Sequence, residues 1–207
     1  MRISRWWLAL LLPIGIAGAW FALKPRGPEP QAALTTHSGE IFGDADSPVG
    51  GNPEGDVTLV EFFDYNCPYC RQTSPLIAQA ETADPRLRVV YKEFPVLGPG
   101  STFAAKAALA AHKQEKFLAF HQALYQIRGP VDESRTLSAA AAAGLDVTRL
   151  KSDMQDPAIE AMVSKNLALA RLLGINDTPG FVIGRQILVG FTPLNALQAA
   201  IRGARGG

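Results

Sequence analysis

Two cysteines, Cys67 and Cys70, are the residues whose type and spacing point most directly to chemistry. They are the only cysteines among 207 residues, and they stand three positions apart in the sequence Cys-Pro-Tyr-Cys. A disulfide between them would close a very small loop and would constrain the unfolded chain little. A thiol pair with this spacing can instead attack a disulfide, form a mixed disulfide and resolve it. The spacing therefore favours redox chemistry.

The cysteine pair is expected at a junction between a strand and a helix. Residues 57–63 are mostly apolar, β-branched and aromatic, which predicts a buried strand, and a helical stretch follows to about Ala83. A cysteine in the first turn of a helix faces unpaired N–H groups and the positive end of the helix dipole, which lower the thiol pKa. Pro68 suits the first helical position because no N–H is needed there.

Three other uses of the pair are less favoured. A zinc site needs two more ligands, and the three histidines, His37, His112 and His121, show no ligand spacing beside the cysteines. The thiolates could bind a soft metal such as Cu(I) in a protein without turnover, or form an inert disulfide. Redox catalysis remains the main interpretation, and we expect it to need no metal or other cofactor.

Other residues near the pair carry a possible role in its chemistry. Glu61 interrupts the apolar strand, and a buried carboxylate there could accept or relay a proton from the thiols. The alternative for Glu61 is a solvent-facing position in an edge strand, and Lys92 on the next strand is a candidate ion-pair partner. Pro75 lies inside the expected helix and should kink it. The Thr178–Pro179 bond precedes a strand, but local sequence alone does not predict that it is cis.

The order of the predicted elements indicates an α/β fold. A strand, a helix and a strand over residues 57–94 form a βαβ unit. Residues 101–174 are alanine-rich and helical, with helices expected at 101–112, 115–127, 137–143, near Leu150 and at 157–174. Two strands at 181–183 and 186–189, joined by the hairpin signal Gly184-Arg185, precede a last helix to about Arg202. A helical block therefore interrupts one sheet.

The N-terminal segment predicts export. Residues 1–24 have a basic start and an apolar run of about 18 residues, which suits either a cleaved signal peptide or a membrane anchor. Residues 25–56, rich in proline and glycine, are expected to be a linker and irregular lead-in. The formal net charge is +1, and residues 31–207 without the basic N-terminal segment are slightly acidic, so nucleic acid is not an expected partner.

These residues together resemble the DsbA-like branch of the thioredoxin superfamily. The matching segments are 61–70, Pro75, 91–95 and 178–183, and with the helical block they span nearly all of 48–202. The resemblance implies a thioredoxin-like domain over 57–97 and 175–203, with an inserted all-helical domain over 98–174 that caps the redox site.

The resemblance also assigns roles to single residues. Cys67 would be the exposed nucleophile and Cys70 the resolving thiol, with Glu61 as the buried acid below them. Pro68 and Tyr69 would tune the redox potential and, with Thr178 and Pro179, contact substrate. It further implies that the Thr178–Pro179 bond is cis.

The expected function is a thiol–disulfide oxidoreductase in the periplasm or on the outer side of the cytoplasmic membrane. It would introduce disulfides into unfolded or reduced exported proteins, and a membrane partner would reoxidise it. An isomerase or reductase of the same compartment is the alternative, because Thr178 before the expected cis-proline is commoner among those members. A metal-binding or scaffold protein is the least favoured.

Overall fold

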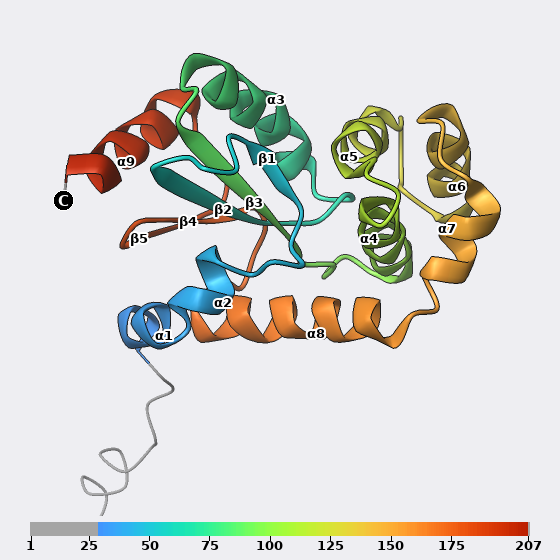
Figure 1. Cartoon of the computed structure of the whole chain (residues 1–207), viewed down its shortest axis with the longest axis horizontal. Coiled ribbons are helices and arrows are strands. Elements are labelled where there is room, and N and C mark those ends of the chain that lie inside the picture. Colours follow the sequence, from blue (N-terminus) through green and yellow to red (C-terminus); the bar gives the residue numbers. More distant parts are fainter. Residues whose placement is uncertain (1–28, 207) are drawn as a thin grey trace, which may run out of the picture.

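The computed structural model describes residues 29–206 and has the expected α/β, thioredoxin-like architecture. A twisted sheet lies between two layers of helices, and a further group of helices stands beside it (Figure 1). The expected signal peptide or anchor, residues 1–24, lies outside the described residues. Within residues 29–206, no helix combines the length and apolar character needed to cross a membrane.

The sheet has five strands in the spatial order β1-β3-β2-β4-β5. Strands β2 and β3 are parallel, and the other neighbouring pairs are antiparallel. The strands are β1 (Val49–Gly51), β2 (Val57–Phe63), β3 (Leu87–Glu93), β4 (Gly180–Ile183) and β5 (Gln186–Val189). Because β2 is the central strand, Glu61 does not lie in an edge strand. The predicted hairpin is confirmed, with Gly184 at φ +56° in the two-residue turn.

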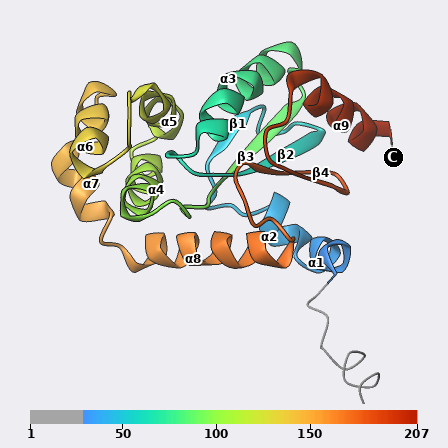
Figure 2. The same ribbon diagram turned by 180° about the vertical axis from the view of Figure 1, so that it is seen from behind.

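The helices divide into three groups (Figures 1 and 2). One face of the sheet carries α3 (Pro68–Ala83) and α9 (Leu194–Gly206). The other face carries α1 (Pro30–Thr36), α2 (Ser38–Phe42) and the long α8 (Pro157–Leu172). The helical group beside the sheet consists of α4 (Pro99–His112), α5 (Phe117–Gln126), α6 (Glu133–Ala142) and α7 (Val147–Asp153).

Side-chain alternation in the two central strands builds two separate cores. Leu59 and Phe63 of β2 and Val89 of β3 point into the core beneath α3 and α9, which continues into the helical group. Val60 and Val90 point the opposite way, into the core beneath α1, α2 and α8. Burial on both faces explains why β2 reads as a nearly continuous apolar run. Each large apolar side chain buried in this way contributes about 1.5–3 kcal/mol.

Residues 25–56 differ from the expected irregular lead-in over their described part. They form α1, α2 and β1, and they bury Leu34 and Ile41 in the core beneath α8. Strand β1 pairs with β3 and closes one edge of the sheet. These elements are too short to show a hydrophobic period in the sequence. Their ordered structure depends on packing against α8 and on pairing with β3.

Helix α8 ends at Leu172, inside the expected helical block 98–174, but it packs on both parts of the molecule. Its N-terminal residues Ile159 and Val163 pack in the core shared with the helical group. Its C-terminal residues Leu169 and Ala170 pack beneath the sheet, in the other core. One helix therefore ties the two parts together.

The expected pairing of Lys92 with Glu61 is wrong. Lys92 follows Tyr91, the residue opposite Glu61, so its side chain points to the other face of the sheet. There the fully buried Lys92 Nζ donates to Asp44 Oδ2 at 2.9 Å, Ser47 Oγ at 2.8 Å and the Glu40 carbonyl at 2.9 Å. This contact fastens the segment between α2 and β1 to the sheet.

Replacing Lys92 by alanine should destabilise the protein by about 3 kcal/mol, because it removes one partner of a buried ion pair. Lys165 Nζ, 2.6 Å from Asp44 Oδ2, remains to limit the loss. Urea unfolding midpoints measure the effect, and Lys113→Ala is the control because its pair with Asp156 is solvent-exposed. Equal losses in the two variants would contradict a special role for the buried pair.

Candidate active site

Strand β2 and helix α3 place the two cysteines as the sequence predicts. The strand ends at Phe63, a three-residue loop follows, and Cys67 is the N-cap of α3. The Cys67 Sγ accepts a hydrogen bond from the Cys70 backbone N–H at 3.4 Å. Both cysteines are free thiols, so the structure represents the reduced state.

The surroundings of Cys67 stabilise its ionised form. The pKa of the Cys67 thiol is lowered to about 6, chiefly by a hydrogen bond from the Cys70 thiol. Burial acts against this effect, while the Thr178 side chain and the backbone N–H groups of Cys70 and Tyr69 add to it. In the protonated form the thiol donates to the Thr178 carbonyl oxygen at 3.2 Å. Cys67 is therefore mostly a thiolate at neutral pH.

Cys70 is the opposite case. It is fully buried, and burial raises the pKa of its thiol, with further increases from the hydrogen bond to Cys67 and from the Glu61 charge. Cys67 is itself only 3% exposed, less than the resemblance implies for a nucleophile, because its sulfur is covered where it contacts Thr178. The pair thus consists of one ionised sulfur at the helix terminus and one protonated sulfur in the core.

The Thr178–Pro179 peptide bond is cis, as the resemblance implies. The Pro179 carbonyl accepts a hydrogen bond from the Gly190 N–H at 2.7 Å, which holds this segment beside the end of β5. Pro68 and Tyr69 lie on the surface, and Tyr69 is 53% exposed. The structure therefore brings Thr178 to Cys67 and leaves the dipeptide between the cysteines open to solvent.

Glu61 lies in the core on the same side of the sheet as α3. It is fully buried, and neither carboxylate oxygen has a hydrogen-bond partner among the described residues. Its pKa is raised to about 8, chiefly by burial, with smaller contributions from the charges of Glu81 and Cys67. The Glu61 carboxyl is therefore mainly protonated at neutral pH and can donate a proton.

The sequence interpretation missed Asp64, which organises the loop before Cys67. Its buried carboxylate accepts hydrogen bonds from the Asn66 N–H at 2.7 Å and the Ser101 hydroxyl at 2.7 Å. It also accepts from the N–H groups of Val96 and Leu97, at 2.8 and 2.9 Å. Ser101, expected to cap a helix, lies instead inside α4, which begins at Pro99. The available signal was Asp-x-Asn, a composition typical of turns.

Asn66 docks the helical group onto the active-site loop. Its Oδ1 accepts from the Val131 N–H at 2.7 Å, and its Nδ2 donates to the Val131 carbonyl at 3.0 Å and to Ser101 Oγ at 3.1 Å. At Gly100 a Cβ atom would lie 2.2 Å from the Val131 carbonyl oxygen, so only glycine fits there. The loop and the start of α4 are thus held against the segment that follows α5.

Arg71, in the first turns of α3, makes a second contact with the helical group. Its guanidinium donates to the carbonyls of Tyr125 and Ile127, the latter at 2.6 Å, where α5 ends. A cation is favourable at this position because helix C-termini carry unsatisfied carbonyls and negative partial charge. The two contacts fix the helical group relative to both cysteines.

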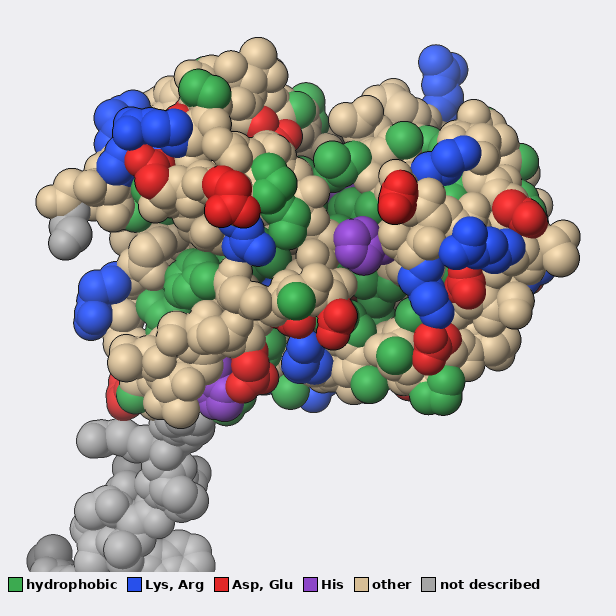
Figure 3. All heavy atoms as spheres, in the orientation of Figure 1, with side chains coloured by type: hydrophobic (Ala, Val, Ile, Leu, Met, Phe, Trp, Pro, Cys, Tyr) green, Lys and Arg blue, Asp and Glu red, His purple; other side chains and the backbone are tan. Residues whose placement is uncertain are grey.

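Exposed apolar side chains surround the cysteine pair. Val96 and Leu97 are held near the active-site loop because their backbone N–H groups donate to Asp64. Val189 and Phe191 flank Gly190, whose N–H donates to the Pro179 carbonyl. Together with Tyr69 they are 43–53% exposed. Elsewhere the surface is mixed: Figure 3 shows positive and negative side chains interspersed on one face of the molecule.

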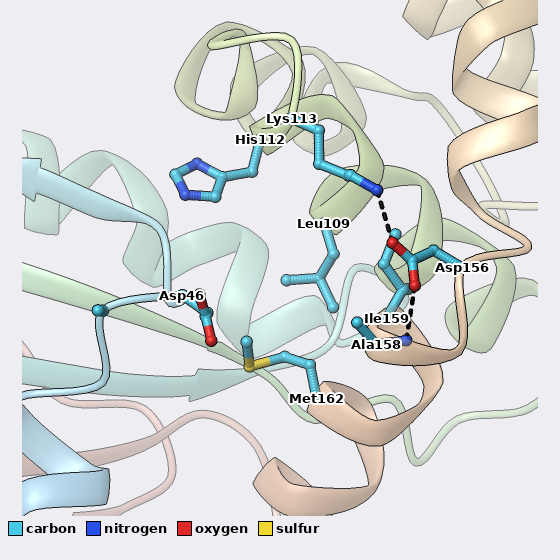
Figure 4. Close-up of a pocket in the computed structure, with 9 residues that line it drawn as sticks. Asp46, Leu109, His112, Lys113, Asp156, Ala158, Ile159 and Met162 are labelled. Atoms are coloured by element: carbon cyan, nitrogen blue, oxygen red, sulfur yellow. Dashed lines mark hydrogen bonds and ion pairs between the residues drawn. The ribbon is translucent and has the colours of Figure 1, made fainter.

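A separate pocket lies between α4, α8 and the loop after α2 (Figure 4). Asp46, His112 and Met162 border it, and an ion pair of Lys113 with Asp156 at 2.7 Å closes one side. The pocket adjoins His112 at the C-terminal end of α4, whereas Ser101 near the N-terminal end of α4 contacts Asn66 of the active-site loop. About 16 Å of helix separates these two residues. We assign this pocket no part in the redox chemistry.

Comparison with known proteins agrees with this geometry. The sequence model of the DSBA-like thioredoxin domain family matches residues 58–202. Among curated proteins, Na(+)/H(+) antiporter NhaA 1 of Salinispora arenicola is 30% identical over 161 residues, which are 77% of this chain and 25% of that protein. The chain therefore spans about a quarter of the length of such curated relatives.

Solved structures match over most of their length. A thioredoxin-like oxidoreductase from Silicibacter pomeroyi is 47% identical with a TM-score of 0.80, covering 82% of this chain and 98% of that one. The thiol-disulfide exchange protein alpha-DsbA2 from Wolbachia pipientis is 29% identical, with a TM-score of 0.78 and coverages of 84% and 95%. A periplasmic thioredoxin-like protein from Salmonella enterica serovar Typhimurium is 32% identical, with a TM-score of 0.77 and coverages of 83% and 97%. The chain belongs to the family of DsbA-like thioredoxin domains, which are thiol–disulfide oxidoreductases.

Proposed function

We propose that the protein is an exported thiol–disulfide oxidoreductase that uses Cys67 and Cys70 to introduce disulfides into cell-envelope proteins. The observation that carries this proposal is the asymmetry of the pair. The pKa of Cys67 is lowered to about 6, while burial raises the pKa of Cys70. A stabilised thiolate stabilises the reduced form of the cysteine pair, and this makes the corresponding disulfide a strong oxidant.

In the first step a substrate thiolate attacks the Cys67 sulfur of the Cys67–Cys70 disulfide. The bond between the two cysteines breaks, a substrate–Cys67 disulfide forms, and the electron pair leaves on the Cys70 sulfur. Burial makes a Cys70 thiolate unfavourable. Glu61, which is mainly protonated at neutral pH, gives it a proton.

In the second step another substrate thiolate attacks the substrate sulfur of the mixed disulfide. The substrate disulfide forms, and Cys67 leaves as the thiolate that its hydrogen bonds stabilise. Low-pKa thiols are good leaving groups, so this step favours release of oxidised substrate. A membrane partner reoxidises the reduced pair by accepting two electrons, and the one proton that Cys70 holds is released.

Reduced, unfolded proteins are the proposed substrates. The exposed apolar side chains around the thiols suit apolar segments that a folded protein would hide. Pro68 and Tyr69 lie in this surface, and the Thr178–Pro179 segment beside Cys67 would contact the substrate backbone. Residues 98–174 would act as an inserted helical domain that caps the redox site.

The proposed location is the periplasm or the outer side of the cytoplasmic membrane. The basic and apolar segment 1–24 supports export, and it would serve as a signal peptide or an anchor. A periplasmic structural relative agrees with this location. Disulfides persist in such oxidising compartments, as the proposed activity requires.

Thr178 supports a second candidate, an isomerase or reductase of the same compartment. Its side chain stabilises the Cys67 thiolate, and threonine at this position resembles members that act on existing disulfides. Such a protein needs a partner that keeps Cys67 reduced. Trapping the redox state in cells separates the two candidates, because a pair found fully oxidised excludes the second.

The reduced protein should be more stable than the oxidised protein, and increasingly so from pH 5 to pH 8. The folded pKa of Cys67 lies near 6, below that of an unfolded thiol at about 8.5, so its stabilisation appears as pH rises through 6 and is lost as pH falls through it. We expect the reduced form to gain about 1 kcal/mol over the oxidised form between pH 5 and pH 7. Urea unfolding of both forms measures this, and a more stable oxidised form would overturn the oxidase proposal.

Removing the Cys70 side chain should raise the pKa of Cys67, because the Cys70 thiol provides the main hydrogen bond to the thiolate. The pH dependence of alkylation by iodoacetamide should have its midpoint near 6 in the wild type and at a higher pH in Cys70→Ala. Cys70→Ser is the matched control, since its hydroxyl can still donate and should leave a smaller shift. A wild-type midpoint near that of an ordinary thiol would contradict the proposed thiolate.

Glu61→Gln should slow reduction of the active-site disulfide at neutral pH by about 10-fold or more, because glutamine cannot protonate Cys70. Single-turnover reduction by glutathione, stopped with acid, measures this step. Glu160→Gln, on the exposed face of α8, is the control.

Cys67→Ser should abolish oxidative refolding of a reduced substrate, and retained activity would favour a scaffold role instead.

A further inference from the structure

Three buried side chains lie in series beside the redox pair, and the proposed mechanism does not use them. The Tyr65 hydroxyl is 3.1 Å from Glu93 Oε1 and 3.1 Å from His121 Nδ1. Exposed fractions are 1% for Tyr65, 1% for Glu93 and 3% for His121. Tyr65 lies two residues before Cys67, Glu93 ends β3, and His121 belongs to α5.

Glu93 shares a face of the sheet with Glu61. The register pairs Glu61 with Tyr91 and Phe63 with Glu93, so the two carboxyls are diagonal neighbours on the side that faces α3. Glu93 Oε2 and both Glu61 oxygens are buried and have no partner among the described residues. Buried polar atoms of this kind are usually satisfied by ordered water. These unpartnered carboxyl oxygens can therefore bind water between Glu61 and Glu93.

The other end of the series reaches a cleft. His121 lines a cavity of about 440 Å³ between α3 and α5, together with Glu81, Tyr91 and Tyr125. On α3 the lining of this cavity runs from Arg71 to Glu81, and neither cysteine is part of it. The three side chains thus run from solvent at the cleft to the carboxyl pair below the cysteines.

We propose that His121, Tyr65 and Glu93 form a proton relay that connects the cleft between α3 and α5 with Glu61. The proposal rests on the proposed function, because it supplies the proton that Glu61 gives to Cys70. Glu93 acts through Glu61 and does not touch the sulfurs. The relay lets protons enter while substrate covers the front of the site.

The relay balances protons in each cycle. When Cys70 leaves, Glu61 gives it one proton and becomes a carboxylate. Glu93 returns one proton to Glu61 through the unpartnered oxygens and intervening water, and Tyr65 passes one proton from its hydroxyl to Glu93. His121 then gives one proton to Tyr65 and takes one from water in the cleft. Reoxidation by the membrane partner runs the same transfers in reverse.

The protonation states of the buried groups suit this role. Burial raises the pKa of Glu93 well above its usual range and lowers the pKa of His121 to about 3. A neutral carboxyl group, a phenol and a neutral imidazole each both donate and accept a hydrogen bond. Glu61 and Asp64 are the other charged groups that face Glu93, and both disfavour its ionised form.

The series could instead only brace the active-site loop against α5. Glu93→Gln separates these roles, since glutamine keeps the hydrogen bond to Tyr65 and is neutral like the buried acid, but cannot pass a proton. Tyr65→Phe keeps the ring and removes the link. Tyr91→Phe is the matched control, because Tyr91 also packs on His121, with centroids 4.9 Å apart, but its hydroxyl faces Glu81.

The test is single-turnover reduction of the Cys67–Cys70 disulfide by glutathione, in H₂O and in D₂O, from pH 5 to pH 9. We expect Glu93→Gln and Tyr65→Phe to slow this step by about 10-fold at pH 7 and to enlarge the solvent isotope effect. Tyr91→Phe should match the wild type. The double variant Glu61→Gln/Glu93→Gln should be no slower than Glu61→Gln alone, because groups in series are not additive.

Two measurements keep the outcomes distinct. Urea unfolding identifies a variant that is slow because it is unstable, and alkylation of Cys67 shows whether the thiolate is intact. Wild-type rates in Glu93→Gln and Tyr65→Phe, or additive losses in the double variant, would overturn the relay while leaving the proposed function standing. Undiminished refolding activity in Cys67→Ser would overturn the proposed function itself.

Discussion

The unequal stabilisation of two sulfur atoms is the interaction on which the rest of this structure depends. Cys67 lies at the N-cap of α3, where hydrogen bonds from Cys70, Thr178 and backbone N–H groups favour its thiolate. Cys70, one turn further, is enclosed by the core and retains its proton. A difference of this kind needs a helix terminus at the end of a central strand, because only there do free N–H groups and a dry interior lie within one helical turn.

The sheet separates two kinds of buried charge by strand alternation. Glu61 and Glu93 lie on the face toward α3 and the cysteines, where no basic side chain among residues 29–206 pairs with either and burial favours their protonated forms. Lys92 points to the other face, where Asp44 satisfies it. An ion pair between Lys92 and Glu61 would have removed the proton that the chemistry needs. The geometry of β3 therefore keeps the structural ion pair apart from the redox site.

The helical group is held by polar contacts with the active-site loop as well as by apolar packing. Asp64 and Asn66 bind α4 and the backbone at Val131, and Arg71 binds the end of α5. All three residues lie within four positions of a cysteine. Any movement of the helical group is thus coupled to the loop that positions Cys67.

The sequence by itself determined the local chemistry and most of the elements. Neighbouring residues carry the signals for β2, for the helix that begins at the Cys-Pro-Tyr-Cys motif, for the hairpin and for α8. The structure contains each of these elements. Tertiary structure alone decided the partner of Lys92, the order within 30–51, the double role of α8, and the joining of Asp64, Asn66 and Ser101. These features depend on pairing register and on contacts between residues 30 to 65 positions apart, which a pattern of adjacent residues does not encode.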